Sequence, residues 1–183
     1  MTPPSSIVTK TGDGGETGLL YGGRVAKDDP RTEAYGALDE AISALGLARA
    51  LCSRPEVRER LLELERECFT VGAELATGHG QRGKLEAHFP TLEPQAADRL
   101  EQEVHRLEDS VGLPDGFVLP GGTPGAAAID LGRTLVRRAE RRAVSLRRSG
   151  ELENPEVLRY LNRLSDLLFM LARQEEAGQT QPK

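Results

Sequence analysis

Residues 124–149 read PGAAAIDLGRTLVRRAERRAVSLRRS, and this stretch predicts a helix with a proline in its first turn. Apolar residues recur in it at the intervals that place side chains on one face of a helix. They are Ala128, Leu135, Ala139, Ala143 and Leu146. Because a helix with one apolar face must bury that face against other elements, the stretch indicates a packed helical fold.

Three arginines form a stripe on another face of the same helix, namely Arg133, Arg137 and Arg141, with Glu140 beside them. Residues four apart stack on one face of an α-helix. Like charges at that spacing repel each other by roughly a few tenths of a kcal/mol per pair. The stripe therefore predicts a partner, which is either a set of acidic side chains or a bound polyanion.

Two structural interpretations of the arginines stay open beside the functional one. In the first, arginines of this helix lie on plain solvated faces. We expect this of Arg138, Arg142, Arg147 and Arg148. In the second, the stripe forms ion pairs between subunits, with Asp39 or Glu40 of the first helix as partner. A carboxylate of that kind also holds an arginine rigid for anion binding, so the second interpretation is compatible with function.

Residues 1–29 are rich in glycine, threonine and aspartate, lack a helical repeat, and read as an extended arm and loop. Within them, residues 9–18 read TKTGDGGETG. Backbone N–H groups freed by glycine, two threonine hydroxyls and Lys10 can surround phosphate oxygens. The Gly-Lys-Ser/Thr of the common phosphate loop is missing, and a simple turn is the alternative. Together with the arginine stripe, the segment suggests a triphosphate site on a helical bundle.

Apolar repeats and breaks at proline and glycine predict four further helices, over residues 30–51, 55–77, 93–112 and 154–175. Short connections imply an all-α, five-helix antiparallel bundle with an extended N-terminal phosphate-binding arm. We expect a mobile loop at residues 78–91. We also expect one domain over residues 1–183, made of an arm (1–29), a bundle (30–175) and a disordered tail (176–183). The predicted core of the four helices is Ala34, Leu38, Ile42, Leu45, Ala48, Leu61, Leu64, Cys68, Val71, Leu100, Val104, Leu107, Leu158, Leu161, Leu168 and Ala172.

The composition argues against several classes of protein. A formal net charge of −5 and an aromatic content of 4% disfavour a general nucleic-acid binder. No apolar run approaches the roughly 20 residues that span a bilayer, and residues 1–6 show no secretory signal, so we expect a cytoplasmic location. Cys52 and Cys68 are expected to be buried free thiols. The three histidines are too scattered to predict a zinc site.

Two further features have a structural and a functional interpretation each. Asn162 and Asp166 lie four residues apart beside an apolar stripe, where a polar pair either bonds to a neighbouring helix or orients a ligand. Phe117 precedes Pro120-Gly121-Gly122. It either fills the core at the entry to a helix or presents an aromatic ring to a flat ligand.

Taken in order along the chain, these motifs resemble those of the PduO-type ATP:cob(I)alamin adenosyltransferases. The resemblance covers roughly residues 7–175, and each motif is weak alone whereas the ordered set is specific. The motifs are TKTGD (9–13), YGGRV (21–25) with Lys27, Arg31 to Tyr35-Gly36, Asp39-Glu40, GAELA (72–76), FVLPGGT (117–123), RRAER (137–141) and YLNRLSD (160–166).

The resemblance implies an activity and its partners. The expected reaction transfers the 5′-deoxyadenosyl group of ATP to the cobalt of cob(I)alamin and releases triphosphate. The expected assembly is a homotrimer with active sites at the subunit interfaces. Mg²⁺ would be bound through the ATP phosphates and not at a dedicated protein site. A flavin-dependent reductase would supply electrons, the product would pass to an adenosylcobalamin-dependent enzyme, and no nucleic acid or membrane would take part.

The resemblance also assigns site residues. Asp39 would pair across the interface with an arginine, here Arg137, and Phe117 would lie below the corrin and keep the lower axial ligand off the cobalt. Catalytic roles fall on Arg137, Arg141, Phe117 and Asp39. ATP contacts fall on Thr9, Lys10, Thr11, Gly12, Lys27, Arg133, Arg137, Glu140, Arg141 and Asn162. Cobalamin contacts fall on Phe117, Asn162 and Asp166.

Two positions depart from the family pattern. Gly14 stands where Lys or Asp is common, which puts one phosphate contact in doubt, and Ile42 replaces a polar Asn. Two other readings compete with the enzyme: a cobalamin carrier or nucleotide sensor without turnover, and a structural bundle whose arginines only join subunits.

Overall fold

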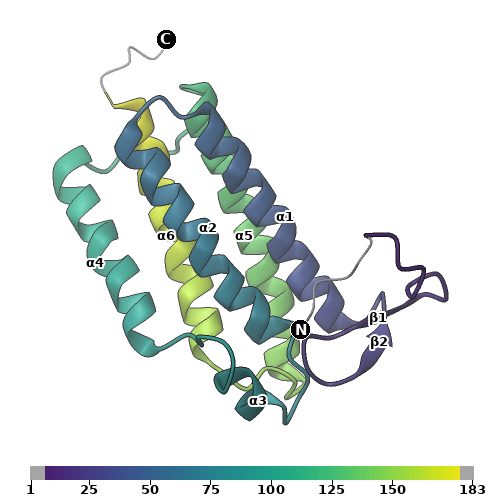
Figure 1. Ribbon diagram of the computed structural model, residues 1–183. Helices are drawn as coiled ribbons and strands as arrows, with labels where there is room; N and C mark the ends of the chain where they lie inside the picture. Colours follow the sequence, from purple (N-terminus) through teal and green to yellow (C-terminus); the bar gives the residue numbers. More distant parts are fainter. Residues whose placement is uncertain (1–6, 178–183) are drawn as a thin grey trace.

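A computed structural model describes residues 7–177 of the chain, so the expectations for residues 1–6 and 178–183 lie outside it. Five long helices dominate it (Figure 1), as the sequence predicted. They are α1 (Pro30–Leu51), α2 (Pro55–Leu75), α4 (Pro94–Val111), α5 (Pro124–Arg148) and α6 (Glu156–Glu176). A short helix α3 (Arg82–Glu86) and a hairpin of β1 (Glu16–Gly18) and β2 (Arg24–Ala26) complete the fold.

The long helices begin where the sequence supplies caps. Proline occupies the first turn of α1, α2, α4 and α5. The Asp29 side chain accepts a hydrogen bond from the N–H of Arg31 at the start of α1, and Thr123 accepts one from Ala126 at the start of α5. These side chains satisfy backbone donors that a helix leaves unpaired at its N-terminus.

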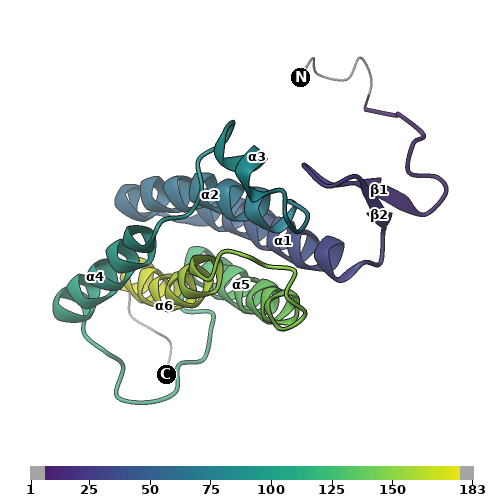
Figure 2. The ribbon, with the colours of Figure 1, turned by 90° about the horizontal axis from the view of Figure 1, so that it is seen from below.

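The helices form two layers, with α1 and α2 over α4, α6 and α5 (Figure 2). Most neighbours are antiparallel, but α4 and α6 run in the same direction. Ion pairs show this, because Asp98 bonds Arg159 near the start of both helices and Glu101 bonds Arg163 one turn later at 3.0 Å. A long connection from α4 to α5 passes across the end of α6 and makes the parallel pair possible (Figure 2).

The seam between α1 and α5 is close because it contains glycine. A Cβ atom added to Gly125 would lie 2.8 Å from the Cα of Cys52, and one added to Gly132 would lie 2.9 Å from Leu45 Cδ2. Contacts that short are repulsive, so a larger residue at either position would force the helices apart.

The core contains most of the predicted residues, including every one predicted on α2. Ile42, Leu107, Leu135 and Leu158 lie at its edge, only partly buried. Cys52 and Cys68 are free and buried, as expected. Burial is the largest cause that raises the thiol pKa of each to about 12, with Glu175 adding to it for Cys52 and Glu67 for Cys68.

Two boundary predictions were wrong. The loop at 78–91 contains α3, whose Leu85 is fully buried, and Glu153 accepts a hydrogen bond from the N–H of Gly80 at 2.6 Å. Glu176 is the last residue of α6 and not part of a tail. Its carboxylate accepts a hydrogen bond from Gly122 N at 3.1 Å and lies 3.0 Å from Arg173, contacts that no local pattern reveals. Within residues 7–177, no helix is long and apolar enough to cross a membrane.

Candidate active site

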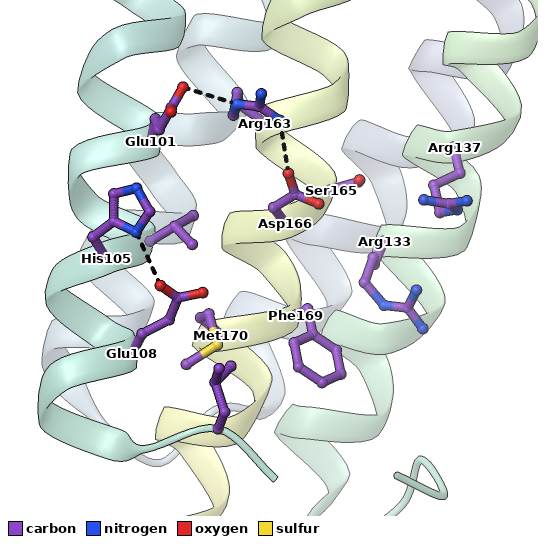
Figure 3. Close-up of a pocket in the computed structure, with 12 residues that line it drawn as sticks. Glu101, His105, Glu108, Arg133, Arg137, Arg163, Ser165, Asp166, Phe169 and Met170 are labelled. Carbon is purple, nitrogen blue, oxygen red and sulfur yellow. Dashed lines mark hydrogen bonds and ion pairs between the residues drawn. The ribbon is translucent and has the colours of Figure 1, made fainter. Parts of the chain in front are cut away.

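A groove of about 450 Å³ opens between α4, α5 and α6. Figure 3 shows Arg133 and Arg137 of α5 facing Asp166 and Phe169 of α6, with α4 on the far side. The groove therefore brings together three residues that the sequence assigned to a site: Arg133, Arg137 and Asp166. Its full lining is Glu101, Val104, His105, Glu108, Leu113, Arg133, Arg137, Arg163, Ser165, Asp166, Phe169 and Met170.

Arg133 is held in place by a buried carboxylate. Its Nε donates a hydrogen bond to Asp130 Oδ1 at 2.9 Å, and Asp130 is 3% exposed. The other oxygen of Asp130 accepts from Arg173 Nη2 at 2.8 Å. The guanidinium carbons of Arg133 and Arg173 lie 6.0 and 5.2 Å from the ring centre of Phe169, within cation–π range. Because Asp130 uses only the Nε of Arg133, both terminal nitrogens stay available to an anion in the groove.

Only Asn162 of the polar pair on α6 bonds a neighbouring helix, as the structural interpretation predicted. Asp166 bonds Arg163 of its own helix and reaches the groove. Asn162 Nδ2 donates to Glu140 Oε1 at 3.2 Å and so joins α6 to α5. Arg163 donates to Asn162 Oδ1 at 2.8 Å and to Asp166 Oδ2 at 3.1 Å. Its hydrogen bond to Glu101 of α4 is the largest cause that raises the pKa of this guanidinium. Arg163 thus links α4 to the two α6 residues assigned to the ligand.

Arg137 and Arg141 are exposed on α5. Across residues 7–177, neither side chain makes a hydrogen bond or an ion pair. Asp39 is also exposed on α1, and the pairing of Asp39 with Arg137 is not formed within one chain. Two guanidinium groups on one helix face thus have no negatively charged partner within residues 7–177, and the partner that the stripe predicts stays a prediction.

The prediction of a plain solvated face was wrong for three of the four arginines. Arg147 donates to the backbone carbonyls of Leu152 and Glu153, and the other two form ion pairs. Arg138 pairs with Glu40 at 3.2 Å and Arg142 pairs with Glu33 at 3.3 Å, so both join α5 to α1. Glu40 is therefore engaged within its own chain. Asp39 remains the carboxylate of that pair that is free for another subunit.

The arm folds into a hairpin that gathers the predicted phosphate contacts. Arg24 of β2 donates to the backbone carbonyl of Thr11 at 2.7 Å and so closes the loop that precedes β1. Thr9 Oγ1 lies 3.0 Å from Thr11 Oγ1, and Lys10 has a left-handed backbone with φ of 58°. A Cβ on Gly12 would lie 3.1 Å from Lys27 Nζ, so this ammonium group lies close against the loop and a larger residue would displace it slightly.

The arm and the arginine stripe do not meet within one chain. The hydrogen bonds that fasten residues 9–29 to the bundle run to Ala76, Gly78 and Thr32, at the ends of α2 and α1. The arm then projects outward from the α1 side of the bundle, whereas the groove opens between α4, α5 and α6 (Figures 1 and 2). The two predicted halves of the triphosphate site are thus separate in the single chain.

Phe117 does not fill the core, because its side chain is fully exposed in the connection before α5. Leu119 in the same connection is 87% exposed. The exposure of both side chains excludes the core-filling interpretation of Phe117. The presented-ring interpretation stays a prediction.

A second groove, of about 420 Å³, lies between α1 and α2 on another side of the bundle. Asp39 and Ile42 line it, and Phe69 at its edge is 68% exposed. The replacement of a polar residue by Ile42 therefore adds to an apolar surface. The remaining lining residues are Leu20, Tyr35, Gly36, Leu38, Cys68, Gly72, Ala73 and Ala76.

Sequence reasoning missed Phe169 of the groove wall, and it missed the pair Asp130 and Arg173, which supports Arg133 without lining the groove. A signal for Asp130 was present, since it lies three residues before Arg133 and so on the same helix face. Phe169 likewise follows Asp166 by one turn. The pairing of Asp130 with Arg173 joins two helices and has no local signature.

Comparison with known proteins identifies the family of this chain. The family model of cobalamin adenosyltransferases matches residues 7–175. A corrinoid adenosyltransferase of Citrobacter freundii is 41% identical over 170 residues, which cover 93% of this chain and 94% of that protein. One of Bacillus subtilis is 40% identical over 171 residues, covering 91% of this chain and 84% of that protein.

Solved structures give the same result. An alanine variant of the PduO-type ATP:corrinoid adenosyltransferase from Lactobacillus reuteri, complexed with cobalamin and ATP, superposes with a TM-score of 0.86. It is 36% identical, and the match covers 97% of each chain. The fold, the ordered motifs and the near-complete matches agree, and the chain belongs to the cobalamin adenosyltransferase family.

Proposed function

We propose that this protein transfers the 5′-deoxyadenosyl group of ATP to the cobalt of cob(I)alamin and releases triphosphate. The observation that carries the proposal is the exposed pair Arg137 and Arg141 beside a groove, on a chain that matches the family over residues 7–175. The relative from L. reuteri holds cobalamin and ATP together, which are the two substrates of this reaction.

Stabilising the departing triphosphate is the first task of the protein. Cob(I)alamin is a strong nucleophile, so the reaction needs positioning and charge stabilisation and no activating base. Negative charge grows on the triphosphate as the carbon–oxygen bond breaks, and Arg137, Arg141 and Lys10 would stabilise it. Hydrogen bonds to charged groups contribute about 1.5–3 kcal/mol each. Each is thus worth roughly one to two powers of ten in rate when made mainly in the transition state.

The remaining predicted contacts have roles in orientation. Thr9, Thr11 and the N–H groups around Gly12 would hold phosphate oxygens, with Lys27 beside them. On the bundle, Arg133 is already fixed by Asp130 for the same purpose. Glu140 and Asn162 bond each other across α5 and α6, and we propose that they contact the nucleotide beyond the triphosphate.

We propose that Mg²⁺ is bound through the ATP phosphates. In residues 7–177, no group of three or more His, Cys, Asp or Glu side chains is arranged to hold a metal ion. Mg²⁺ usually keeps several waters and takes its other ligands from carboxylates and phosphate oxygens. Mg²⁺ would supply positive charge to the triphosphate, and the arginines would supply the rest.

Phe117 and Asp166 are proposed to contact the corrin. A ring presented below the cobalt would exclude water and the lower base, which eases reduction of Co(II) to the reactive Co(I) state. The full exposure of Phe117 suits this role, since the ring has no other contact to give up. Asp166 sits on the groove wall with Arg163 fixing its carboxylate.

We further propose a homotrimer with each active site at a subunit interface. Three observations support it: the arm lies apart from the arginines of its own chain, Asp39 and Arg137 lack partners within residues 7–177, and an apolar groove flanks Asp39. An arm from one subunit and an arginine stripe from the next would complete the triphosphate site. As the family resemblance implies, we propose one domain acting in the cytoplasm, a flavin-dependent reductase as electron donor, and an adenosylcobalamin-dependent enzyme as recipient.

An anaerobic assay tests the function directly. Purified protein is mixed with chemically reduced cob(I)alamin and Mg-ATP, and both the Co(I) spectrum and triphosphate release are followed. Equimolar formation of light-sensitive adenosylcobalamin and triphosphate is the expected result. Binding of either substrate without turnover would favour a carrier or sensor, and binding of neither would favour a structural bundle.

The variant Arg141→Ala tests the triphosphate assignment. Because the exposed side chain of Arg141 makes no hydrogen bond or ion pair within residues 7–177, we expect its loss to leave the fold and the assembly intact. We expect most of the turnover to be lost, by about ten- to a hundredfold if one charge-assisted hydrogen bond disappears. Full activity with pre-reduced substrate would refute the role of Arg141.

A further inference from the structure

Arg31 is a buried arginine that joins three parts of the bundle. It lies in the first turn of α1, and its side chain is 4% exposed. Its Nη1 donates to the backbone carbonyls of Leu75 at 3.0 Å and Thr77 at 2.5 Å. Its Nη2 donates to the carbonyl of Glu151 at 2.6 Å and to the carboxylate of the same residue at 3.0 Å. A buried guanidinium is tolerated only with such partners, so Arg31 fixes the end of α2 against the turn before α6.

The N-terminal arm docks on the same segment that Arg31 holds. The N–H of Leu20 donates to the carbonyl of Ala76 at 3.0 Å, and the N–H of Gly78 donates to the carbonyl of Tyr21 at 2.7 Å. Along residues 75–78, backbone groups therefore alternate between Arg31 and the arm. Movement of this segment away from Arg31 would carry the docking groups of the arm with it.

The contact between arm and bundle is too close to slide. A Cβ on Gly22 would lie 2.9 Å from the Cα of Gly78, and Gly22 has φ of +116°, so the two backbones touch. Close backbone contact of this kind needs both segments in one defined place. The position of the arm is therefore set by the end of α2, which Arg31 sets in turn.

We propose that Arg31 is a positioning residue for nucleotide binding, which acts by holding residues 75–78 in the place where the arm docks. The inference rests on the proposed function, in which Thr9, Lys10 and Thr11 of the arm contact ATP. A protein whose binding-competent form is only partly populated has an apparent Kd raised by the inverse of that fraction. Loss of the Arg31 contacts to residues 75–78 is thus expected to weaken ATP binding without changing the chemistry at the cobalt.

The test compares Arg31→Lys with Arg147→Lys in the full chain. Lysine keeps the positive charge, but its single nitrogen cannot span the carbonyls of Leu75 and Glu151 together. Arg147 is a matched control, because its Nη1 also donates to two backbone carbonyls, Leu152 and Glu153, but not to the segment that holds the arm. We expect KM for ATP to rise about tenfold in Arg31→Lys if the docked arm falls to about a tenth. The control is expected to keep both kcat and KM.

Two further measurements keep the proposal open to refutation. Glu151→Gln removes the carboxylate that pairs with Arg31, and this side chain is half exposed, so the variant should fold. We expect its KM for ATP to rise less than that of Arg31→Lys. Trypsin should cleave the arm faster in Arg31→Lys than in the control when no nucleotide is present. The cleavage sites in the arm are Lys10, Arg24 and Lys27.

The outcomes separate this inference from the proposed function. A lower thermal stability with unchanged KM for ATP and unchanged arm cleavage would make Arg31 purely structural and overturn the inference. A rise in KM for cobalamin equal to that for ATP would overturn it as well. Wild-type protein that binds no ATP would refute the proposed function. The cleavage experiment would still show whether Arg31 holds the arm in place.

Discussion

The variant Asp130→Asn tests whether a buried carboxylate holds the first arginine of the groove. Asp130 is 3% exposed and accepts hydrogen bonds from Arg133 at 2.9 Å and Arg173 at 2.8 Å. Asparagine keeps the shape, but it has no charge and offers one oxygen where two were used. One of the two guanidinium groups would then face an NH₂ group.

The cost follows from burial and from the partners that remain. Removing one member of a buried ion pair destabilises a protein by about 3–5 kcal/mol. Arg173 keeps Glu176 at 3.0 Å and the side chain of Arg133 is 24% exposed, so part of the charge stays compensated. We therefore expect about 2–3 kcal/mol, at or just below the low end of that range. For a chain of this size the melting temperature should fall by about 4–12 °C.

Thermal unfolding followed by circular dichroism measures this, with Glu40→Gln as a matched control. The control makes the same change from carboxylate to amide in an interhelical pair whose side chains are about half exposed. It should cost less than about 1 kcal/mol. ATP affinity should fall in Asp130→Asn, because Arg133 loses the bond that fixes its direction. Equal melting temperatures for both variants and the wild type would refute the argument.

Three other variants test separate parts of the proposal. Phe117→Ala should leave the melting temperature unchanged, because the ring is fully exposed. It should impair adenosylation from Co(II) more than from pre-reduced Co(I), and equal losses in both assays would contradict the axial-ligand role. Asp39→Asn should weaken ATP binding several-fold by releasing Arg137 of a neighbouring subunit, whereas unchanged affinity in a binding titration would leave Asp39 as an ordinary surface residue. Burial, followed by the nearby Glu67, raises the pKa of the Cys68 thiol from 9.0 to about 12. The folded state therefore favours the protonated thiol, and this contribution is present below pH 9 and lost as the pH rises from 9 toward 12. Denaturant titrations should therefore show a smaller fall in the free energy of unfolding for Cys68→Ala than for the wild type over that alkaline range. An equal fall in both proteins would refute this.

The sequence determined the helices and most of the core because these depend on local patterns. Apolar residues at helical spacing, proline in first turns and the caps Asp29 and Thr123 act within a few residues. The arginine stripe was readable for the same reason, since charges four residues apart must share a helix face.

Only the tertiary structure decided how these pieces meet. Contacts between residues far apart in the chain make α4 and α6 a parallel pair and join Asp130 to Arg173. Packing of the same kind buries Glu176. The exposure of Phe117 and the separation of the arm from Arg137 are likewise properties of the packed bundle. The physical reason is that spacing along a helix fixes a direction in that helix alone, whereas a partner on another helix depends on how the two pack.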